Sequence, residues 1–356
     1  MEKMYAALLE EYKHFRWKEV DKPTFTDDEV LIKVEYAGIC GTDHHIFLGE
    51  FHPRTPVPFI PGHEFSGIIV ETGRHVMDFK VGDRVAVDPI IWCGKCPACK
   101  REHYTACSSL KLLGVDMNGG FGQYINVKPY MLFKVDPSIP PAHAALVEVL
   151  SIGFHACNRA DVGKNDSIVI WGAGKVGQCV LQAARTRTRN TIILVDILDN
   201  RLRRAKEAYP DIHTVNCRIE SPIDRIMEIT DSKGVDIAFE VVGNHVEISN
   251  IPNPVRGCVQ SIRGAGIVCV LGLSDDPAPV LFKELIWKEA KIVTSRVSLG
   301  EFSEAIENLE KKTLKPDVLV TDILELSEIQ KGFEMLEDDP ENHLKILIKL
   351  DPRSDT

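Results

Sequence analysis

Six short apolar runs alternate with helical stretches between Ser167 and Ser295, and this alternation restricts the fold more than any other feature. The runs are SIVIW (167–171), TIILVD (191–196), HTVN (213–216), VDIAFEVV (235–242), GIVCVLGL (266–273) and AKIVTS (290–295). Helical stretches such as 175–186 and 200–209 supply the crossovers of a dozen or so residues that parallel strands need. Six such strands predict a complete doubly wound parallel sheet.

The regions on either side of this alternation have a different pattern of predicted secondary structure. Residues 1–153 contain short β-rich segments separated by turns, such as Glu29–Gly38 and Phe121–Val127, which predict a compact barrel or sandwich. After Arg296 only a helix (302–311), a strand (318–324), a helix (327–336) and a strand (343–349) remain, too few for a third domain. We expect them to pack on the N-terminal domain, so that one domain comprises 1–153 and 297–356 and the other 154–296.

Charge and cysteine content narrow the class of protein. The 356 residues carry 42 Lys and Arg against 52 Asp and Glu, a net charge of −10, which argues against a zinc-finger nucleic-acid binder because such a protein needs a basic face. We expect neither a secretory leader nor a membrane span, because the first residues contain no apolar stretch and no apolar run reaches membrane length. Ten cysteines at this length are too sparse for a disulfide scaffold. We therefore expect a cytoplasmic protein with small-molecule ligands and some metal-binding cysteines.

A glycine-rich turn follows the first run of the alternation. Gly172, Gly174 and Gly177 form G-x-G-x-x-G between a predicted strand and a predicted helix that starts near Lys175 and Val176. The glycines allow a tight turn, close approach of a pyrophosphate and close helix packing, and the helix start offers free N–H groups to the anion. This context predicts a dinucleotide site.

Asp196 ends the second run, and its position bears on which dinucleotide binds. A carboxylate there can accept hydrogen bonds from both ribose hydroxyls and would repel a 2′-phosphate, which favours NAD over NADP. A helix-capping role is the alternative for Asp196. Arg201 follows closely enough to contact the cofactor, and this weakens the predicted preference for NAD over NADP.

A cysteine-rich lobe contains Cys93, Cys96, Cys99 and Cys107, spaced C-x2-C-x2-C-x7-C. Four thiolates on one short loop can close a tetrahedral zinc site, and closed sites are structural. An iron–sulfur cluster is the sharpest alternative, but the bacterial ferredoxin run has its fourth cysteine four positions after the third, followed by proline. The spacing favours structural zinc, with free thiols as the remaining reading.

A second set of candidate ligands lies in GICGTDHH (38–45) and PGHEF (61–65). Cys40, His63 and Glu64 are ligands that zinc accepts, and three protein ligands would leave a position open for a substrate oxygen. Each of these residues alone would more often have a structural role. It is their occurrence together with the cysteine lobe that indicates a second zinc site.

At this point the chain resembles the zinc-dependent medium-chain alcohol/polyol dehydrogenases. It carries GICGTDxH, GHE, the four-cysteine lobe, LVEVLSIGFHAC (146–157) and G-x-G-x-x-G in that family's order, over essentially the whole chain. LVEVLSIGFHAC and the C-terminal LKILIKLDP (344–352) are most similar to the sorbitol (iditol) dehydrogenase group. The resemblance implies an α/β fold with a GroES-like β-rich catalytic domain and a Rossmann nucleotide-binding domain, two zinc ions per chain, NAD and a homodimer or homotetramer.

The resemblance also implies roles for single residues. Cys40 and His63 match the catalytic zinc ligands, Glu64 matches the carboxylate after that histidine, and Glu148 matches an acidic residue that either binds the zinc or holds its water. Thr42 matches the hydroxyl that takes the substrate proton and His45 the end of that proton relay. Asp43 is similar to a carboxylate that orients the histidine ligand.

Two departures from the family pattern affect these assignments. Val149 stands where the family usually has Pro, which leaves the geometry near Glu148 open. The segment TSRVSL (294–299) does not align with the Arg–Tyr pair of animal sorbitol dehydrogenases, so Arg296 either contacts ligand or is an exposed ion-pairing residue. We expect the loops 47–58 and 110–120 to set the substrate.

The predicted activity is hydride transfer from a secondary alcohol of a polyol, sugar alcohol or cyclitol to NAD, and the reverse ketone reduction. An L-threonine 3-dehydrogenase is the first alternative, although Ile90, Ile91 and Trp92 occupy the approach where those enzymes usually carry a His. A catalytically silent, metal-stabilised scaffold is the second alternative, and the intact Cys40 and His63 argue against it. Cys157, Cys179, Cys217, Cys258 and Cys269 lie in apolar patterns and are expected in the core.

Overall fold

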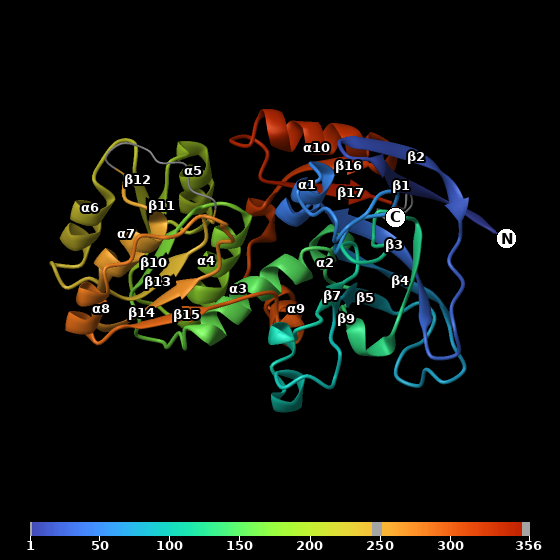
Figure 1. Ribbon diagram of the computed structural model, residues 1–356, viewed down its shortest axis with the longest axis horizontal. Coiled ribbons are helices and arrows are strands. Elements are labelled where there is room, and N and C mark those ends of the chain that lie inside the picture. The colour runs from blue at the N-terminus through green and yellow to red at the C-terminus, as the bar shows by residue number, and fades with distance from the viewer. Residues whose placement is uncertain (1, 244–250, 351–356) are drawn as a thin grey trace. The chain divides into compact units, whose positions relative to one another are not determined.

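A computed structural model describes residues 2–243 and 251–350, and these fall into two compact units (Figure 1). Unit 1 comprises Met1–Glu148, Phe302–Lys312 and Leu319–Thr356, and unit 2 comprises Val149–Glu301 and Thr313–Val318. The sequence-based division places 1–153 and 297–356 in the first domain, but 149–153, 297–301 and Thr313–Val318 group with unit 2. Thr313–Val318 is bonded directly to that unit, because the Lys315 amide donates to Gln182 Oε1 (2.8 Å) and Arg204 donates to the Val318 carbonyl (2.9 Å).

Unit 1 is built on a seven-stranded sheet. Its strand order is β16-β17-β3-β4-β5-β9, and β8 also pairs with β3. The C-terminal strands join this sheet, as expected, and the core lies between the sheet, the β1–β2 hairpin and helices α1 and α10. The elements of the unit are β1 (Lys3–Glu11), β2 (His14–Asp21), β3 (Val30–Gly38), α1 (Gly41–Phe47), β4 (Glu64–Thr72), β5 (Arg84–Val87), β6 (Ile90–Ile91), β7 (Lys111–Leu112), β8 (Tyr124–Val127), β9 (Leu132–Lys134), α2 (Pro141–Ala144), α9 (Phe302–Glu310), β16 (Val320–Glu325), α10 (Ile329–Asp338) and β17 (Lys345–Lys349).

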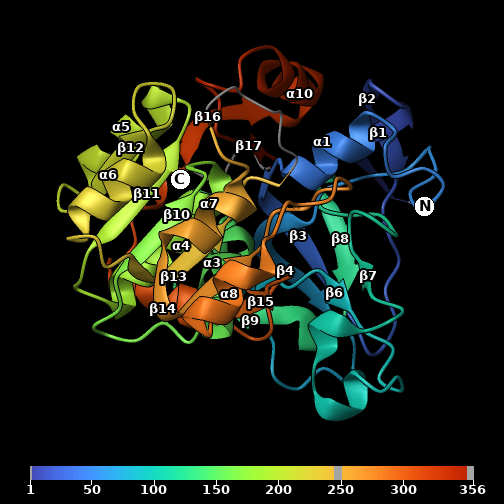
Figure 2. The same cartoon turned by 60° about the vertical axis from the view of Figure 1, so that its left-hand side comes forward.

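Unit 2 is a six-stranded parallel sheet in the order β12-β11-β10-β13-β14-β15 (Figure 2), which confirms the doubly wound sheet expected from the alternation. Successive residues of the central strands β10 and β11 are all buried except Asp196, which shows that helices cover both faces. The elements are α3 (Val147–Arg159), β10 (Ile168–Trp171), α4 (Lys175–Arg187), β11 (Ile192–Asp196), α5 (Asp199–Ala208), β12 (His213–Asn216), α6 (Pro222–Ile229), β13 (Val235–Glu240), α7 (Pro254–Ser261), β14 (Ile262–Val270), α8 (Phe282–Lys288) and β15 (Lys291–Thr294).

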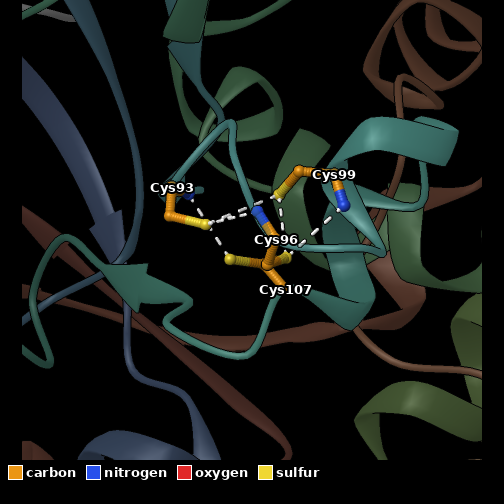
Figure 3. A group of neighbouring side chains, drawn as sticks. All are labelled: Cys93, Cys96, Cys99 and Cys107. Carbon is orange, nitrogen blue, oxygen red and sulfur yellow. Dashed lines mark hydrogen bonds between the residues drawn. The ribbon is translucent and has the colours of Figure 1, made fainter.

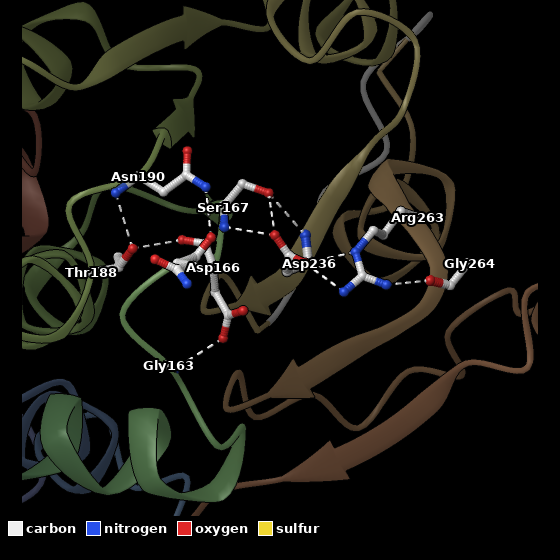
Figure 4. Close-up of polar contacts among 9 residues, drawn as sticks. Gly163, Asp166, Ser167, Thr188, Asn190, Asp236, Arg263 and Gly264 are labelled. Carbon is white, nitrogen blue, oxygen red and sulfur yellow. Dashed lines mark hydrogen bonds and ion pairs between the residues drawn. The ribbon is translucent and has the colours of Figure 1, made fainter.

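A polar cluster ties together the amino ends of three neighbouring strands, β10, β13 and β14 (Figure 4). The Asp236 carboxylate accepts hydrogen bonds from the Ser167 amide (2.7 Å), the Ser167 hydroxyl (2.6 Å) and Arg263 Nε (2.6 Å). These bonds hold the amino ends of the three strands together, whereas doubly wound sheets generally bind their ligands at the opposite, carboxyl edge.

Within the described residues, no helix combines the length and apolar character needed to cross a membrane. Of the cysteines expected in the core, Cys157, Cys179, Cys258 and Cys269 are buried, which confirms that expectation for four of them, whereas Cys217 is partly exposed.

Candidate metal sites and nucleotide site

The first candidate metal site lies at one end of three neighbouring strands of unit 1. In the register of the sheet, Gly38 of β3 pairs with Glu64 of β4 on one side and with Leu347 of β17 on the other. Cys40 follows β3, Glu64 begins β4 and Lys345 begins β17, so antiparallel pairing brings these three residues, distant in sequence, to the same end of the sheet.

Three candidate ligands meet there. The Cys40 sulfur, a His63 ring nitrogen and a Glu64 carboxylate oxygen lie within 4.8 Å of one another. Asp43 orients this group from α1, because its Oδ2 accepts from the Cys40 amide (2.9 Å) and its Oδ1 lies 3.2 Å from His63 Nδ1. A carboxylate can only accept, so His63 Nδ1 carries the proton and Nε2 is left for a metal. The donor set fits zinc.

The charges around this group favour a cation. Burial lowers the pKa of His63, but the negative charges of Asp43 and Cys40 outweigh it and raise that pKa well above its usual value. Burial, and then the charge of Glu64, raise the pKa of the Glu148 carboxyl to about 8. Glu148 at the start of α3 is 4% exposed and lies outside the three-residue ligand group, so its part in metal binding stays a prediction.

Lys345 is a site residue that the sequence analysis missed. Its side chain is fully buried, and its Nζ donates to Glu64 Oε2 and to the Ile39 carbonyl (3.2 Å). The signal in the sequence is a lysine within LKILIKL, where four consecutive residues from Lys345 to Ile348 are buried. A buried lysine needs an anionic partner, and the sequence alone does not identify that partner as Glu64.

The expected relay residues both lie on α1. Thr42 is partly buried in the first turn, and His45 lies in the last turn with its side chain 45% exposed and paired with Glu50. The structure therefore joins Thr42 and His45 to the Cys40 segment through one short helix. Their catalytic roles stay predictions.

The two loops expected to set the substrate are bonded to each other. Arg54 makes two hydrogen bonds to Asp116 (3.0 and 2.8 Å), and the Thr55 hydroxyl donates to the Val115 carbonyl (2.9 Å). The second loop also contacts the turn before His63, because the Gly120 amide donates to the Gly62 carbonyl (2.7 Å). Both loops are thus fixed relative to the candidate metal ligands.

The four lobe cysteines form the second candidate metal site (Figure 3). Their sulfur atoms lie within 4.8 Å of one another, and backbone amides point at them, such as Cys96 N to Cys93 Sγ (3.4 Å) and Ser109 N to Cys107 Sγ (3.4 Å). Backbone donors from Cys99 and Ser108 lower the pKa of Cys96 to about 5. Four sulfur atoms on one short loop, with backbone amides pointing at them, fit a tetrahedral structural zinc.

The glycine turn of unit 2 has the geometry that its sequence predicts. Gly172 adopts a φ of +110°, and a Cβ on Gly177 would lie 1.9 Å from the Gly172 carbonyl oxygen, so both positions require glycine. Gly174 caps α4, and the helix starts at Lys175 and Val176. The amides of this first turn face the place where a pyrophosphate would bind.

Asp196 lies at the end of β11 and bonds directly to this turn. Its Oδ2 accepts from the Ala173 amide (2.6 Å), and its Oδ1 accepts from the amides of Ile197 and Leu198 (2.7 and 2.9 Å). The carboxylate therefore shapes the glycine turn and the loop before α5, and its role in binding the cofactor ribose stays a prediction. Arg201 lies close by, with Nη1 3.7 Å from the position of a Cβ on Gly174, whereas Arg296 is exposed.

A cavity of about 860 Å³ opens at the carboxyl ends of β13 and β14. Its lining includes Glu240, Asn253, Val270, Gly272 and Ser274, none of which the sequence analysis singled out. The cavity lies at the edge where doubly wound sheets bind their ligands. The ends of β13 and β14 could be predicted from the sequence, but the loops that line the cavity contain no motif that would have predicted it.

Comparison with known proteins identifies the family of this chain. Residues 26–137 match the family described as "Alcohol dehydrogenase GroES-like domain", and residues 176–311 match "Zinc-binding dehydrogenase". An uncharacterized zinc-type alcohol dehydrogenase-like protein of Haemophilus influenzae is 35% identical over 346 residues, 97% of this chain and 98% of the relative. Sorbitol dehydrogenase of Bacillus subtilis is 32% identical over 351 residues, 97% of each protein.

Other relatives differ in their named substrates. L-threonine 3-dehydrogenase of Bacillus velezensis is 31% identical, covering 90% of this chain and 91% of the relative. The crystal structure of the Escherichia coli alcohol dehydrogenase rspB, complexed with NADH, superposes with a TM-score of 0.89 at 28% identity, covering 98% of this chain and 99% of that chain. These matches confirm the expected GroES-like and Rossmann folds. Because they extend over nearly the full length of both partners, this chain belongs to the zinc-dependent medium-chain alcohol and polyol dehydrogenase family.

Proposed function

We propose that this protein is a zinc- and NAD-dependent dehydrogenase that oxidises a secondary alcohol of a polyol, sugar alcohol or cyclitol, and reduces the corresponding ketone. The observation that carries the proposal is the group of Cys40, His63 and Glu64, oriented by Asp43, within the unit that matches the alcohol dehydrogenases. Zinc in this group would act as a Lewis acid on the alcohol oxygen, and NAD would accept the hydride.

The chain's own residues supply the remaining steps. Asp43 holds the His63 ring with Nε2 available as a ligand, and the Thr42 hydroxyl takes the proton of the substrate hydroxyl. His45 releases a proton to water, which its half-exposed side chain allows. Asp196 and the amides after Gly174 hold the dinucleotide, and the Asp196 charge favours NAD over NADP.

An L-threonine 3-dehydrogenase activity is the second candidate, supported by the relatives of that name. The test is a panel of polyols and cyclitols against L-threonine, each with NAD and with NADP, on zinc-loaded protein, read by the absorbance of the reduced cofactor. Turnover of a polyol with NAD and about two zinc ions per chain are the expected results. Turnover of L-threonine alone would overturn the polyol assignment.

Thr42→Val tests the proton relay. The variant should lose about 10²–10⁴ of kcat, the usual contribution of a positioned proton-transfer group, while retaining both zinc ions. Wild-type turnover in this variant would refute the relay.

We also propose that the protein forms a homodimer or homotetramer through the β15 side of unit 2. β15 is the last strand of its sheet, and the neighbouring α8 exposes Phe282, Ile286 and Trp287 by 71%, 70% and 75%. A second copy of the chain could extend the sheet and cover these side chains. Light scattering of Trp287→Lys should show monomers, and an unchanged mass would refute this interface. The cytoplasmic location stays a prediction.

A further inference from the structure

The C-terminal end of α1 has a backbone motif that places Glu50 against His45. Gly49 adopts a φ of +83°, its amide donates to the Ile46 carbonyl (2.9 Å), and the Glu50 amide donates to the His45 carbonyl (3.0 Å). These two bonds define a Schellman motif, in which the second residue past the helix cap lies beside the third residue from the end of the helix. An apolar pair usually occupies those positions, but here they hold a carboxylate and an imidazole.

The two side chains are bonded as well as adjacent. Glu50 Oε2 lies 2.5 Å from His45 Nδ1, and the side chains are 54% and 45% exposed. An exposed ion pair of this kind contributes little to the free energy of unfolding, so a stabilising role does not explain why Glu50 contacts His45. A carboxylate at Nδ1 does have a chemical consequence, since it accepts the Nδ1 proton and leaves Nε2 as the acceptor nitrogen of the neutral ring.

We propose that Glu50 is a positioning residue of the proton relay, which holds His45 in the Nδ1–H tautomer so that Nε2 accepts the proton released by the alcohol. This inference rests on the proposed function. When a relay O–H bond breaks, an Nε2–H bond forms and the ring becomes imidazolium. The ring then gives one proton to water, so that one proton leaves the alcohol and one reaches the solvent.

Two substitutions separate the tautomer from the charge. Glu50→Ala removes the acceptor, whereas Glu50→Gln removes the charge but keeps an oxygen that can accept from Nδ1. In zinc-loaded protein, we expect Glu50→Ala to lower kcat about tenfold with little change in KM, a fraction of what a proton-transfer group contributes. Glu50→Gln should restore most of that loss. Both variants keep the backbone bonds of the motif, so the fold and the zinc content should not change.

The tautomer itself is measured by 15N NMR of the histidine rings in zinc-loaded, substrate-free protein. The wild type and Glu50→Gln should show His45 with its proton on Nδ1, and Glu50→Ala should show a shift toward the Nε2–H form. Asp28→Asn is the matched control, because His75 Nδ1 and Asp28 Oδ1 form a similarly exposed pair (2.9 Å) in the same unit. That control should leave kcat and the His45 signals unchanged.

The outcomes are distinct. Wild-type kcat in Glu50→Ala, an unchanged His45 tautomer, or an equal loss in Asp28→Asn would each overturn the proposal. Failure of the wild type to oxidise any alcohol would refute the proposed function instead. The tautomer measurement does not depend on turnover, so the two failures can be told apart.

Discussion

Replacing Lys345 with Met should leave a buried carboxylate without its cation. Lys345 and Glu64 are both 0% exposed, and Lys345 Nζ contacts Glu64 Oε2 and the Ile39 carbonyl. Methionine nearly preserves the length and apolar volume of the lysine stem, so the change removes one charge and two hydrogen bonds with little change in packing.

The magnitude follows from burial and contact. Two unit charges in hydrogen-bond contact attract by about 5 kcal/mol at an effective dielectric of about 20, and removing one partner of a buried ion pair costs about 3–5 kcal/mol. In zinc-free protein we expect a loss in this range, since Glu64 also lies near the buried Glu148. Bound zinc would compensate the Glu64 charge and reduce the loss by about 1.4 kcal/mol or more, which by linkage means about tenfold tighter zinc binding.

Hydrogen exchange of peptides from β3 and β17 is the suitable assay, because it reports on the unit that contains the pair even if the two units unfold separately. Arg84→Met is the control, since Arg84 pairs with Glu35 (2.8 Å, 18% and 4% exposed) away from the candidate ligands and should show a loss that is independent of zinc. A loss below about 1 kcal/mol, or equal losses with and without zinc, would refute the reasoning.

Three further predictions concern the other sites. Cys99→Ser should remove about one zinc ion per chain and speed hydrogen exchange of the lobe around Trp92, because a structural site needs all four thiolates; an unchanged zinc count would exclude the lobe as a metal site. Gly177→Ala should unfold or loosen unit 2, because its Cβ would lie 1.9 Å from the Gly172 oxygen. Gly174→Ala should keep the thermal stability, because its Cβ meets nothing closer than Arg201 at 3.7 Å, but should weaken NAD binding measured by calorimetry. Equal melting temperatures for the two variants would contradict this. Burial raises the pKa of Glu301, but its bonds to His155 and Asn158 outweigh burial and lower that pKa from 4.5 to about 2. Glu301 therefore contributes about 3 kcal/mol to the free energy of unfolding above pH 4.5, and this contribution is lost as the pH falls toward 2. Acid unfolding of Glu301→Gln should lack this pH dependence.

Much of the fold and of the candidate sites was predictable from local patterns. The alternation from Ser167 predicted the six-stranded doubly wound parallel sheet of unit 2, since parallel strands joined by helices have few right-handed arrangements, and the structure gave the order of its strands. The spacing of the four lobe cysteines predicted their convergence, because four thiolates on one short loop can close around a single zinc ion. The glycine turn could also be predicted from the sequence, because the backbone conformation itself requires glycine at Gly172 and Gly177.

Only the tertiary structure decided which residues from distant segments pair with the site residues. Lys345 lies 281 positions from Glu64, and the antiparallel pairing of β17 with β3 and of β3 with β4 brings them together. Asp196 bonds to Ala173 because β11 lies beside β10. Sequence patterns show which residues can carry charge or bind metal. The charge that balances each buried group depends on strand register and loop packing, which arise from the whole core and have no local motif.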